Sequence, residues 1–193
     1  MAAPDFDAGP VTVHRIEPLA VVALRHLPGA GEALARALQA AGIADIPALG
    51  QALGNGRNQG AWALWRSPSE VTLLAFEQAT ADAAMAALAA DKLACAVDQT
   101  GGTLALELRG PLVDDLLRRL VDSRSLPVDQ GGAIRARLID IAVVLVRQQT
   151  DTVWLLADRS HGHYLASWLS YAGVALAQLP SPRPVPAGAR AGH

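Results

Sequence analysis

Two stretches of the chain decide the fold: residues 19–38, LAVVALRHLPGAGEALARAL, and residues 104–120, LALELRGPLVDDLLRRL. Each begins with a short apolar run typical of a buried strand, followed by a turn that contains glycine and proline. Each then continues with apolar residues at helical spacing. One offset relates the two sets, because Val22 precedes Leu104 by 82 residues (104 − 22) and Leu34 precedes Leu116 by 82 (116 − 34). The sequence therefore predicts an internal duplication.

The duplication continues beyond these stretches into two hairpins and two further helices. In the first copy two apolar runs flank the polar turn 67–70, and in the second copy two apolar runs flank the turn 148–151. An apolar strand, a short polar turn and a second apolar strand are typical of a β-hairpin. A helix is predicted after each hairpin, with Thr80 and Ser160 as the N-terminal caps. The buried stripe of the last helix is predicted to contain Tyr164, Leu165, Trp168 and Leu169.

These elements predict an α+β fold built from two pseudo-repeated strand–helix–strand–strand–helix halves. We expect a mixed or antiparallel sheet with helices on one face, and a further strand at residues 94–97. One internally duplicated domain is expected over residues 11–176, with its halves at about 11–92 and 93–176.

Both ends of the chain are predicted to lie outside this domain. Residues 1–10 show no periodicity and are expected to form a flexible tail. Residues 177–193 are expected to form a proline-rich tail, because four alternating prolines prevent helix formation. The alternative is that this segment orders against a partner. The four prolines are Pro180, Pro182, Pro184 and Pro186.

The composition predicts a globular chain that has no electrostatic partner. Hydrophobic residues make up 51% and charged residues 18% of the 193 residues, and the formal net charge is −2. Such a small charge favours neither nucleic acid nor a membrane surface as a partner. No apolar run reaches the roughly 18 residues of a membrane span, and Asp5 and Asp7 replace the basic start of a signal peptide. We therefore expect a cytoplasmic protein. Cys95 is the one cysteine, which excludes an intrachain disulfide.

The motifs that bear on catalysis are weak. Gly29-Ala30-Gly31 is a partial dinucleotide-binding pattern, but Leu34 occupies its third small position. His161 and His163 lie two residues apart at the start of a helix, where side chains diverge, so a surface position is favoured over a metal site. The G-x-S-x-G, H-E-x-x-H and P-loop patterns are missing from the sequence. We therefore predict no catalytic, cofactor-binding or metal-binding residue in this chain.

The acidic and basic residues of the predicted helix after residue 111 are interpreted as a solvated face. Asp114 is four residues before Arg118, and Asp115 is four residues before Arg119. Ion pairs at this spacing stabilise an exposed helix by a few tenths of a kcal/mol. The sequence predicts surface pairs here and not an acid–base couple.

Four residues are predicted to contact a partner. Trp62 and Trp65 are three residues apart on a predicted strand, so one is expected to face outward, although a core position is the first interpretation. An exposed tryptophan often anchors a protein interface. Asn55 and Arg57 lie in a Gly/Asn-rich segment that interrupts the first half only. This segment is predicted to be a flexible loop, with partner contact as the functional alternative.

Three motifs in order resemble the gamma subunits of sarcosine oxidase. AVDQTGG at residues 96–102, followed by LALELRGP at 104–111, is similar to the V-D-Q-S-x-G … L-x-G-P segment of that family. LWRSPSEV at 64–71 resembles L-x-L-G-P-D-E-W, and LLADRS at 155–160 with SWL at 167–169 resembles L-x-V-x-R-S … W-L. Ser67 stands where the family usually has glycine and Val71 where it has tryptophan. These departures leave the methylated amine open.

The resemblance implies a fold related to the folate-binding domain of aminomethyltransferases. It implies a non-catalytic gamma subunit of a heterotetrameric sarcosine oxidase, acting in assembly or stabilisation. That flavoenzyme of one-carbon metabolism demethylates sarcosine to glycine, with formation of hydrogen peroxide and methylene-tetrahydrofolate. The expected partners are the large flavin- and folate-binding alpha subunit and the beta and delta subunits. FAD, FMN, NAD and tetrahydrofolate are expected in those partners, and no cofactor is expected in this chain.

The alternative function is a stand-alone folate-binding one-carbon protein of the aminomethyltransferase type. The two halves would then enclose a pterin, and Arg135 or Arg137 would meet its glutamate tail. The short chain, the missing K-G-C-Y-x-G-Q-E signature and the lack of a clear catalytic aspartate count against this alternative.

Overall fold

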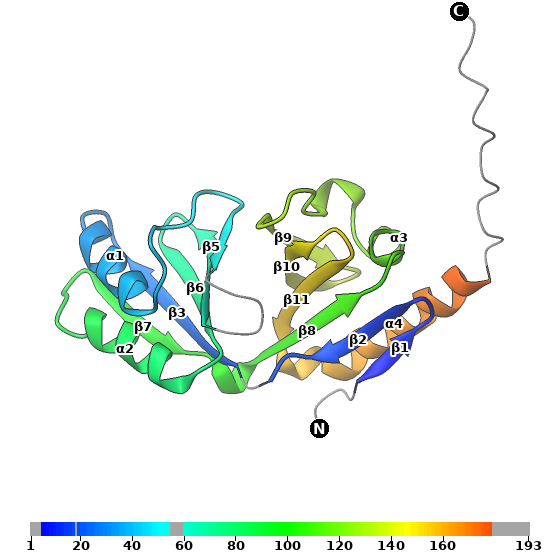
Figure 1. The fold of residues 1–193 in the computed structure, drawn as a ribbon, viewed down its shortest axis with the longest axis horizontal. Coiled ribbons are helices and arrows are strands. Elements are labelled where there is room, and N and C mark those ends of the chain that lie inside the picture. Colours follow the sequence, from blue (N-terminus) through cyan, green and yellow to red (C-terminus); the bar gives the residue numbers. More distant parts are fainter. Residues whose placement is uncertain (1–4, 18, 55–59, 179–193) are drawn as a thin grey trace, which may run out of the picture.

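The computed structural model describes residues 5–17, 19–54 and 60–178, which form two antiparallel sheets with helices on their outer faces (Figure 1). The strands are β1 (Phe6–Ala8), β2 (Val11–Arg15), β3 (Ala20–His26), β4 (Ala52–Gly54), β5 (Ala61–Ser67), β6 (Glu70–Ala75), β7 (Ala94–Asp98), β8 (Thr103–Arg109), β9 (Ala133–Leu138), β10 (Ile141–Gln149) and β11 (Thr152–Asp158). The α-helices are α1 (Gly31–Ala40), α2 (Gln78–Leu88), α3 (Val113–Leu117) and α4 (Gly162–Ala177). Within the described residues, none of the helices has the length and hydropathy needed to cross a membrane.

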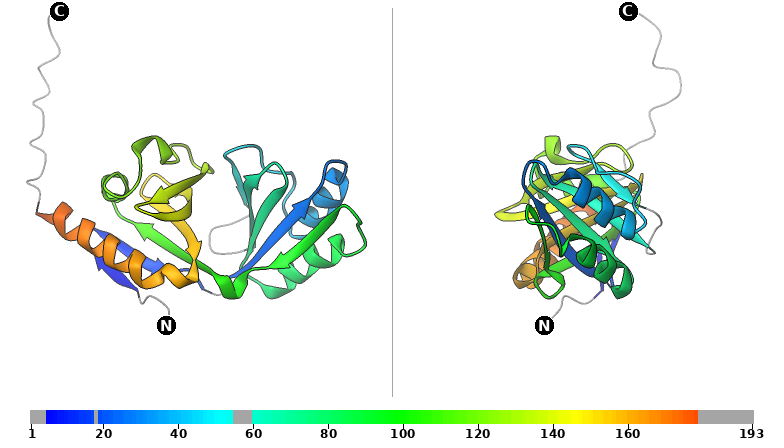
Figure 2. Two further views of the ribbon diagram at one scale, coloured as in Figure 1. Left: turned by 180° about the vertical axis from the view of Figure 1, so that it is seen from behind. Right: turned by 90° about the vertical axis from the view of Figure 1, so that its left-hand side faces the viewer.

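The two sheets have equivalent strand orders, which confirms the predicted α+β fold and its duplication. The first sheet has the order β4-β5-β6-β3-β7, and the second has the order β9-β10-β11-β8-β2-β1. Apolar residues of α1 and α2 form one core with the first sheet, and those of α3 and α4 form another with the second sheet. The opposite sheet faces point toward each other in the middle of the molecule (Figure 2). Helices therefore cover one face of each sheet, as predicted.

The boundary between the halves differs from the predicted one at residues 92 and 93. β7 follows that boundary in sequence but pairs with β3 in the first sheet. β2 lies at the start of the predicted first half but pairs with β8 in the second sheet. β3 and β8 are interior strands, and each needs a partner on both edges. The chain supplies the second neighbour of each of these strands from the other predicted half. Each sheet therefore contains strands from both predicted halves.

The N-terminal region also differs from the flexible tail expected for residues 1–10. β1 pairs with β2 in register Phe6↔Val13 and Ala8↔Val11, and the side chain of Ala8 is fully buried. A Cβ atom placed on Gly173 of α4 would overlap the backbone of Ala8. The close backbone approach of α4 therefore holds β1 in place. The predicted proline-rich tail lies outside the described residues from residue 179 onward, whereas Ala177 is the last residue of α4.

The strand pairing in the two hairpins shows which residues of the two copies are equivalent, more directly than the apolar pattern does. Trp65 pairs with Val71 in the first hairpin and Arg147 pairs with Val153 in the second, and each pair is followed by a bulge. The offset between the hairpins is therefore 82 (147 − 65). The strands β3 and β8 follow another offset, because Val22 faces Leu73 whereas Leu106 faces Leu155, the equivalent of Leu73. That offset is 84 (106 − 22), and a shift of two residues leaves each side chain on the same sheet face.

The helix starts are set by other residues than those predicted. α2 begins at Gln78 after Glu77, two positions before Thr80. α4 begins at Gly162 after His161, and Ser160 lies in the preceding 3-10 turn. The Asp158 carboxylate caps that turn by accepting the backbone N–H of Ser160 at 2.8 Å. The predicted caps were placed by residue type alone, and the strand ends decide where each helix starts.

Candidate functional site

Trp62 faces the middle of the molecule and contacts the other half. Its ring lies 5.4 Å from that of Trp154 in an edge-to-face arrangement, and Phe76 approaches Trp154 at 5.9 Å. Trp154 is fully buried and donates its indole N–H to the Glu107 carboxylate at 3.1 Å. Trp154 belongs to the apolar cluster between the two sheets, and Trp62 and Phe76 pack against that cluster. Trp62 therefore holds the halves together within the chain.

The other predicted contact residues lie elsewhere. Trp65 is half-buried at the end of β5, beside the bulge, and borders the cleft between the halves. Asn55 and Arg57 lie outside the described residues. The structure thus places Trp62 between the sheets and Trp65 at the border of the cleft.

The cleft between the halves has a volume of about 490 Å³ and is lined by both sheets and by the segment that joins them. The lining residues are Val21, Leu64, Trp65, Arg66, Thr72, Asp98, Gln99, Gly102, Thr103, Ala142, Val144, Leu156, Ala157 and Asp158. Polar and apolar groups line this cleft in about equal parts, and its volume lies within the range of small-molecule sites. Its position between the sheets makes it the first place to look for a ligand.

Arg66 is the basic residue of this cleft, and its surroundings identify a second arginine. Burial lowers the pKa of Arg66, and the positive charge of Arg135 lowers it further, whereas Glu70 raises it. Arg66 therefore has a like charge nearby, and its Nε lies 3.9 Å from the Glu70 carboxylate. Arg137 turns toward its own hairpin and donates to the Asp140 carbonyl at 2.9 Å. Of the two arginines named by the folate alternative, Arg135 is the one whose charge reaches the cleft.

Two aspartates at the cleft are engaged in local turns. Hydrogen bonds from the side chain and backbone of Thr100 lower the pKa of Asp98 below its ordinary value of 3.8. Those from the Ser160 hydroxyl, at 2.6 Å, and its backbone N–H lower the pKa of Asp158 in the same way. Both carboxylates are therefore ionised at neutral pH and satisfied by the chain itself. Neither has the raised pKa that a general acid needs.

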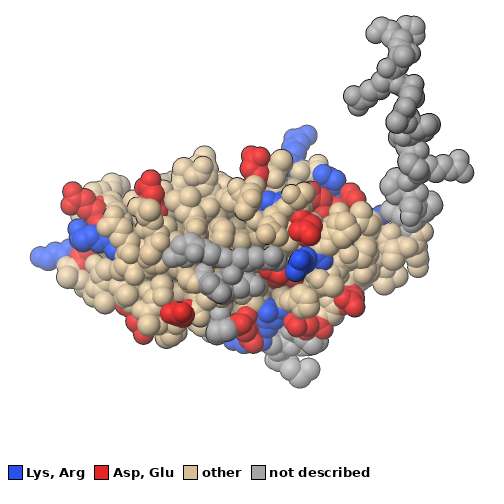
Figure 3. All heavy atoms as spheres, viewed as in Figure 1, with Lys and Arg blue, Asp and Glu red and all other residues tan. Residues whose placement is uncertain are grey.

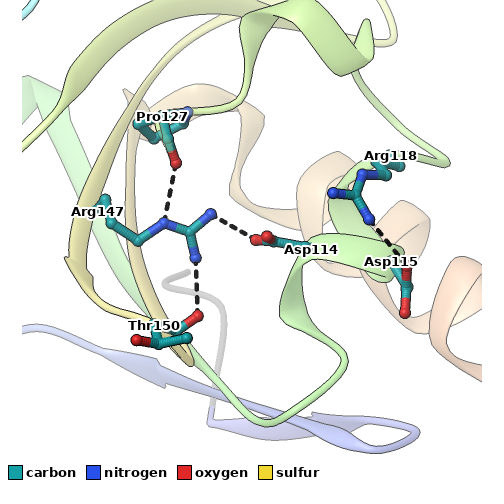
Figure 4. A network of polar contacts seen from close by, with 6 residues as sticks. All are labelled: Asp114, Asp115, Arg118, Pro127, Arg147 and Thr150. Atoms are coloured by element: carbon teal, nitrogen blue, oxygen red, sulfur yellow. Dashed lines mark hydrogen bonds and ion pairs between the residues drawn. The ribbon is translucent and has the colours of Figure 1, made fainter. Parts of the chain in front are cut away.

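The ion pairs predicted for the helix that follows residue 111 differ in the structure, because a buried arginine takes one of the aspartates. Arg147 is only 3% exposed and donates to the Pro127 carbonyl at 2.9 Å, the Thr150 carbonyl at 3.2 Å and the Asp114 carboxylate (Figure 4). Asp114 therefore pairs across the fold with Arg147 and not with Arg118, which bonds Asp115 at 3.2 Å. This network ties α3 to β10 and has a structural role.

The weak motifs show no catalytic arrangement. Gly29 has a φ of 99° at the tight turn before α1, which explains a glycine there without a nucleotide. His161 and His163 are exposed at the start of α4. Within the described residues, no three His, Cys, Asp or Glu side chains gather where they could hold a metal ion.

Sequence reasoning missed an exposed row of aromatic residues on α4. Tyr164 and Trp168 were predicted to face the core with Leu165 and Leu169. The leucines are buried and Trp168 is partly buried against the core of the second sheet, whereas Tyr164 is exposed. Tyr164 is 38% exposed and Tyr171 is 70% exposed. The spacing 164–168–171 places these rings on one helix face. The sequence signal for this row is that large apolar residues occupy more than one face of the helix, but this pattern does not tell which of these faces is covered.

No protein-family model and no curated protein matches this sequence, whereas several solved structures resemble the chain, among them the following two. The first is a chain of the heterotetrameric sarcosine oxidase from Corynebacterium sp. U-96, in complex with pyrrole 2-carboxylate. It has a TM-score of 0.79 and 24% identity over 93% of this chain and 92% of that chain. The second is the glycine cleavage system aminomethyltransferase T from Bartonella henselae, with a TM-score of 0.59 and 17% identity over 83% of this chain.

The two likenesses differ in how much of the known protein they include. This chain spans 45% of the aminomethyltransferase chain but nearly all of the sarcosine oxidase chain. The duplicated sheets and their outer helices therefore form a unit that is part of a larger chain in one protein and a chain of similar extent in the other. The chain has the α+β fold of a chain of heterotetrameric sarcosine oxidase, which is related to the folate-binding fold of aminomethyltransferases.

Proposed function

We propose that this chain is the gamma subunit of a heterotetrameric complex of the sarcosine oxidase type, with a non-catalytic role in assembly or stabilisation. The observation that carries the proposal is the likeness to a sarcosine oxidase chain over 93% of this chain and 92% of that one. The motif order at residues 64–71, 96–111 and 155–169 supports it independently. FAD, FMN, NAD and tetrahydrofolate would then belong to the partner subunits.

The chemistry of the cleft supports the non-catalytic part of the proposal. Asp98 and Asp158 carry lowered pKa values and bond to their own turns. The Ser160 hydroxyl donates to Asp158, so it serves a turn and not a nucleophilic attack. Oxidation of the amine would take place at flavins in the other subunits.

Co-expression with the flavin-carrying subunits of the same organism tests this function. The expected result is one complex on size exclusion, containing this chain in a fixed ratio and oxidising sarcosine or a related methylated amine with release of hydrogen peroxide. Omission of this chain should lower the yield or thermal stability of the complex. A well-folded monomer that elutes apart from the flavoproteins would contradict the proposal.

A second candidate function is folate binding by this chain itself. It is favoured by the cleft of about 490 Å³ between the halves and by the two arginines beside it, Arg66 and Arg135. A pair of guanidinium groups suits the carboxylates of a glutamate tail. Calorimetric titration of the isolated chain with tetrahydrofolate should give a micromolar Kd in this case, and Arg135→Ala should weaken it about tenfold, a loss of one charge-assisted hydrogen bond. Arg137→Ala is the matched control, because Arg137 bonds its own hairpin.

A further inference from the structure

The outer face of α4 carries a continuous row of aromatic rings. Tyr164 and Trp168 have ring centroids 6.1 Å apart, and Trp168 and Tyr171 have centroids 5.9 Å apart, both edge to face. Val174, 56% exposed, extends the row by one helical turn. We call Tyr164, Trp168, Tyr171 and Val174 the aromatic strip. Exposed rings that already stack on each other lose little side-chain entropy when a partner covers them.

The aromatic strip is held rigidly. Leu165, Leu169 and Leu176 of α4 are buried against the second sheet. Gly173 approaches β1 so closely that a side chain at that position would overlap the Ala8 backbone. α4 lies along β1 and β2 on the outside of the molecule, away from the other half (Figure 2). The strip is therefore pre-organised and is separate from the cleft between the sheets.

A membrane surface does not suit this helix. None of the residues from Gly162 to Ala177 is Lys, Arg, Asp or Glu. Helices that lie on membranes place Lys and Arg on their polar face to meet anionic lipid. The charged residues elsewhere on the visible face of the molecule are of both signs and interspersed (Figure 3). An uncharged helix instead matches an uncharged protein surface, since a buried charge opposite it would have no partner.

A second copy of the chain is also a poor match, because the strip is narrow. A helix of 16 residues is about 24 Å long and about 10 Å wide, so its outer face covers about 240 Å². Two such faces in contact would bury roughly 500 Å², about half of what a specific interface requires. A concave partner avoids this limit, because it covers the sides of the helix as well as its crest. Binding of a helix in an apolar groove is a recurrent mode of protein recognition.

We propose that the aromatic strip of α4 docks into an uncharged, apolar groove on a flavin-carrying partner subunit. This inference rests on the proposed function and adds the surface through which the chain joins the complex. Tyr171 is the most exposed ring of the strip and serves as the central anchor. The tyrosine hydroxyls remain available for hydrogen bonds at the groove rim, as is common for interface tyrosines.

The duplicated helix α2 supplies a matched control. Its buried residue Ala84 corresponds to Leu165 of α4 (165 − 84 = 81). By the same offset Tyr164 corresponds to Ala83, an exposed alanine (164 − 81 = 83). Glutamate at Ala83 therefore adds the same charge to an equivalent outer helix face that lacks aromatic residues.

The test is quantitative co-purification with the co-expressed flavin-carrying subunits. Tyr171→Glu and Tyr164→Glu should each weaken association at least tenfold, whereas Ala83→Glu should stay within twofold of the wild type. Circular dichroism and thermal melting of the free chain should be alike in all variants, because these positions are exposed. Hydroxyl-radical labelling of Tyr171 should fall on formation of the complex.

The outcomes separate this inference from the proposed function. If the wild-type chain fails to join the flavoproteins, the proposed function is overturned and this inference with it. If the wild type joins them and Tyr171→Glu joins equally well, only the docking surface is overturned. A dimer of the free chain that Tyr171→Glu disrupts, or flotation of the wild type with anionic phosphatidylserine vesicles, would also overturn it.

Discussion

The helices α2 and α4 occupy equivalent places in the two halves, but their outer faces differ. Both follow a hairpin and bury an apolar stripe against the outer face of their own sheet. The outer face of α2 carries alanines and Asp82, whereas that of α4 carries the aromatic strip. The difference shows that duplication preserved what packing requires and left the solvent side free to diverge. An interaction surface can therefore arise on one copy without disturbing the fold.

The equivalent edges of the two sheets differ as well. In the first sheet β7 is the last strand, and in the second sheet the corresponding strand β2 is followed by β1. β1 is also the strand that α4 contacts through Gly173. The extra strand thus belongs to the half that carries the exposed aromatic residues. It widens the sheet on which α4 rests and fixes the helix in place.

The largest expected effect is on the coupling between the halves. Trp154→Ala removes a fully buried ring from the central cluster and should lower the free energy of unfolding by about 3–5 kcal/mol. Urea unfolding followed by far-UV circular dichroism measures this change. Trp168→Ala is the control, because Trp168 is only partly buried and should cost about 1 kcal/mol or less. Equal losses would contradict a central role for Trp154.

The next largest effect is expected for the buried Arg147, in comparison with the exposed Arg118. Arg147→Ala leaves the Pro127 and Thr150 carbonyls and the Asp114 carboxylate without this donor. We expect a loss of about 2–3 kcal/mol in unfolding free energy. Arg118→Ala breaks only an exposed pair and should cost about 0.5 kcal/mol or less. A loss near that of Arg118→Ala would show that water replaces the network.

The contact between α4 and β1 should give a smaller effect. Gly173→Ala forces the Ala8 backbone away from α4 and should destabilise the chain by about 1–2 kcal/mol, as overpacking does. Gly101→Ala is the control, since no atom lies within 4 Å of the Cβ position there. Limited proteolysis near β1 should become faster in Gly173→Ala alone. An unchanged rate would mean that β1 does not depend on α4.

The smallest effect is the pH dependence of the two turn aspartates, one in each half. Hydrogen bonds from Thr100 and Ser160 lower the folded-state pKa values of Asp98 and Asp158. Their contribution to stability is therefore present above the ordinary pKa of 3.8 and is lost as the pH falls through the lowered folded values. Asp98→Asn and Asp158→Asn should each flatten the acid limb of an unfolding free-energy profile measured from about pH 5 to about pH 2.5. A steeper limb in either variant would contradict this assignment.

The candidate site was less predictable than the fold, and Trp62 shows why. Its spacing from Trp65 placed the two rings on different faces of β5 but did not say which face would meet the other half. Tyr164 and Trp168 have the same difficulty on α4, where apolar residues lie on more than one face. A periodic pattern reports that two sides differ. When both sides are apolar, only the neighbouring elements decide which side is covered.

The sequence by itself determined the elements and their duplication. Apolar spacing, turn residues and the repetition of these patterns about 82 residues apart can be read from local sequence, since strand and helix periodicities record which residues share a face. The tertiary structure decided the exchange of β2 and β7 between sheets, the pairing of β1, the burial of Arg147 and the exposure of the aromatic strip. Each of these depends on contacts between segments far apart in the chain, such as Asp114 with Arg147 and Ala8 with Gly173. No local pattern encodes them, because the free energy of burying a residue depends on which distant element lies over it.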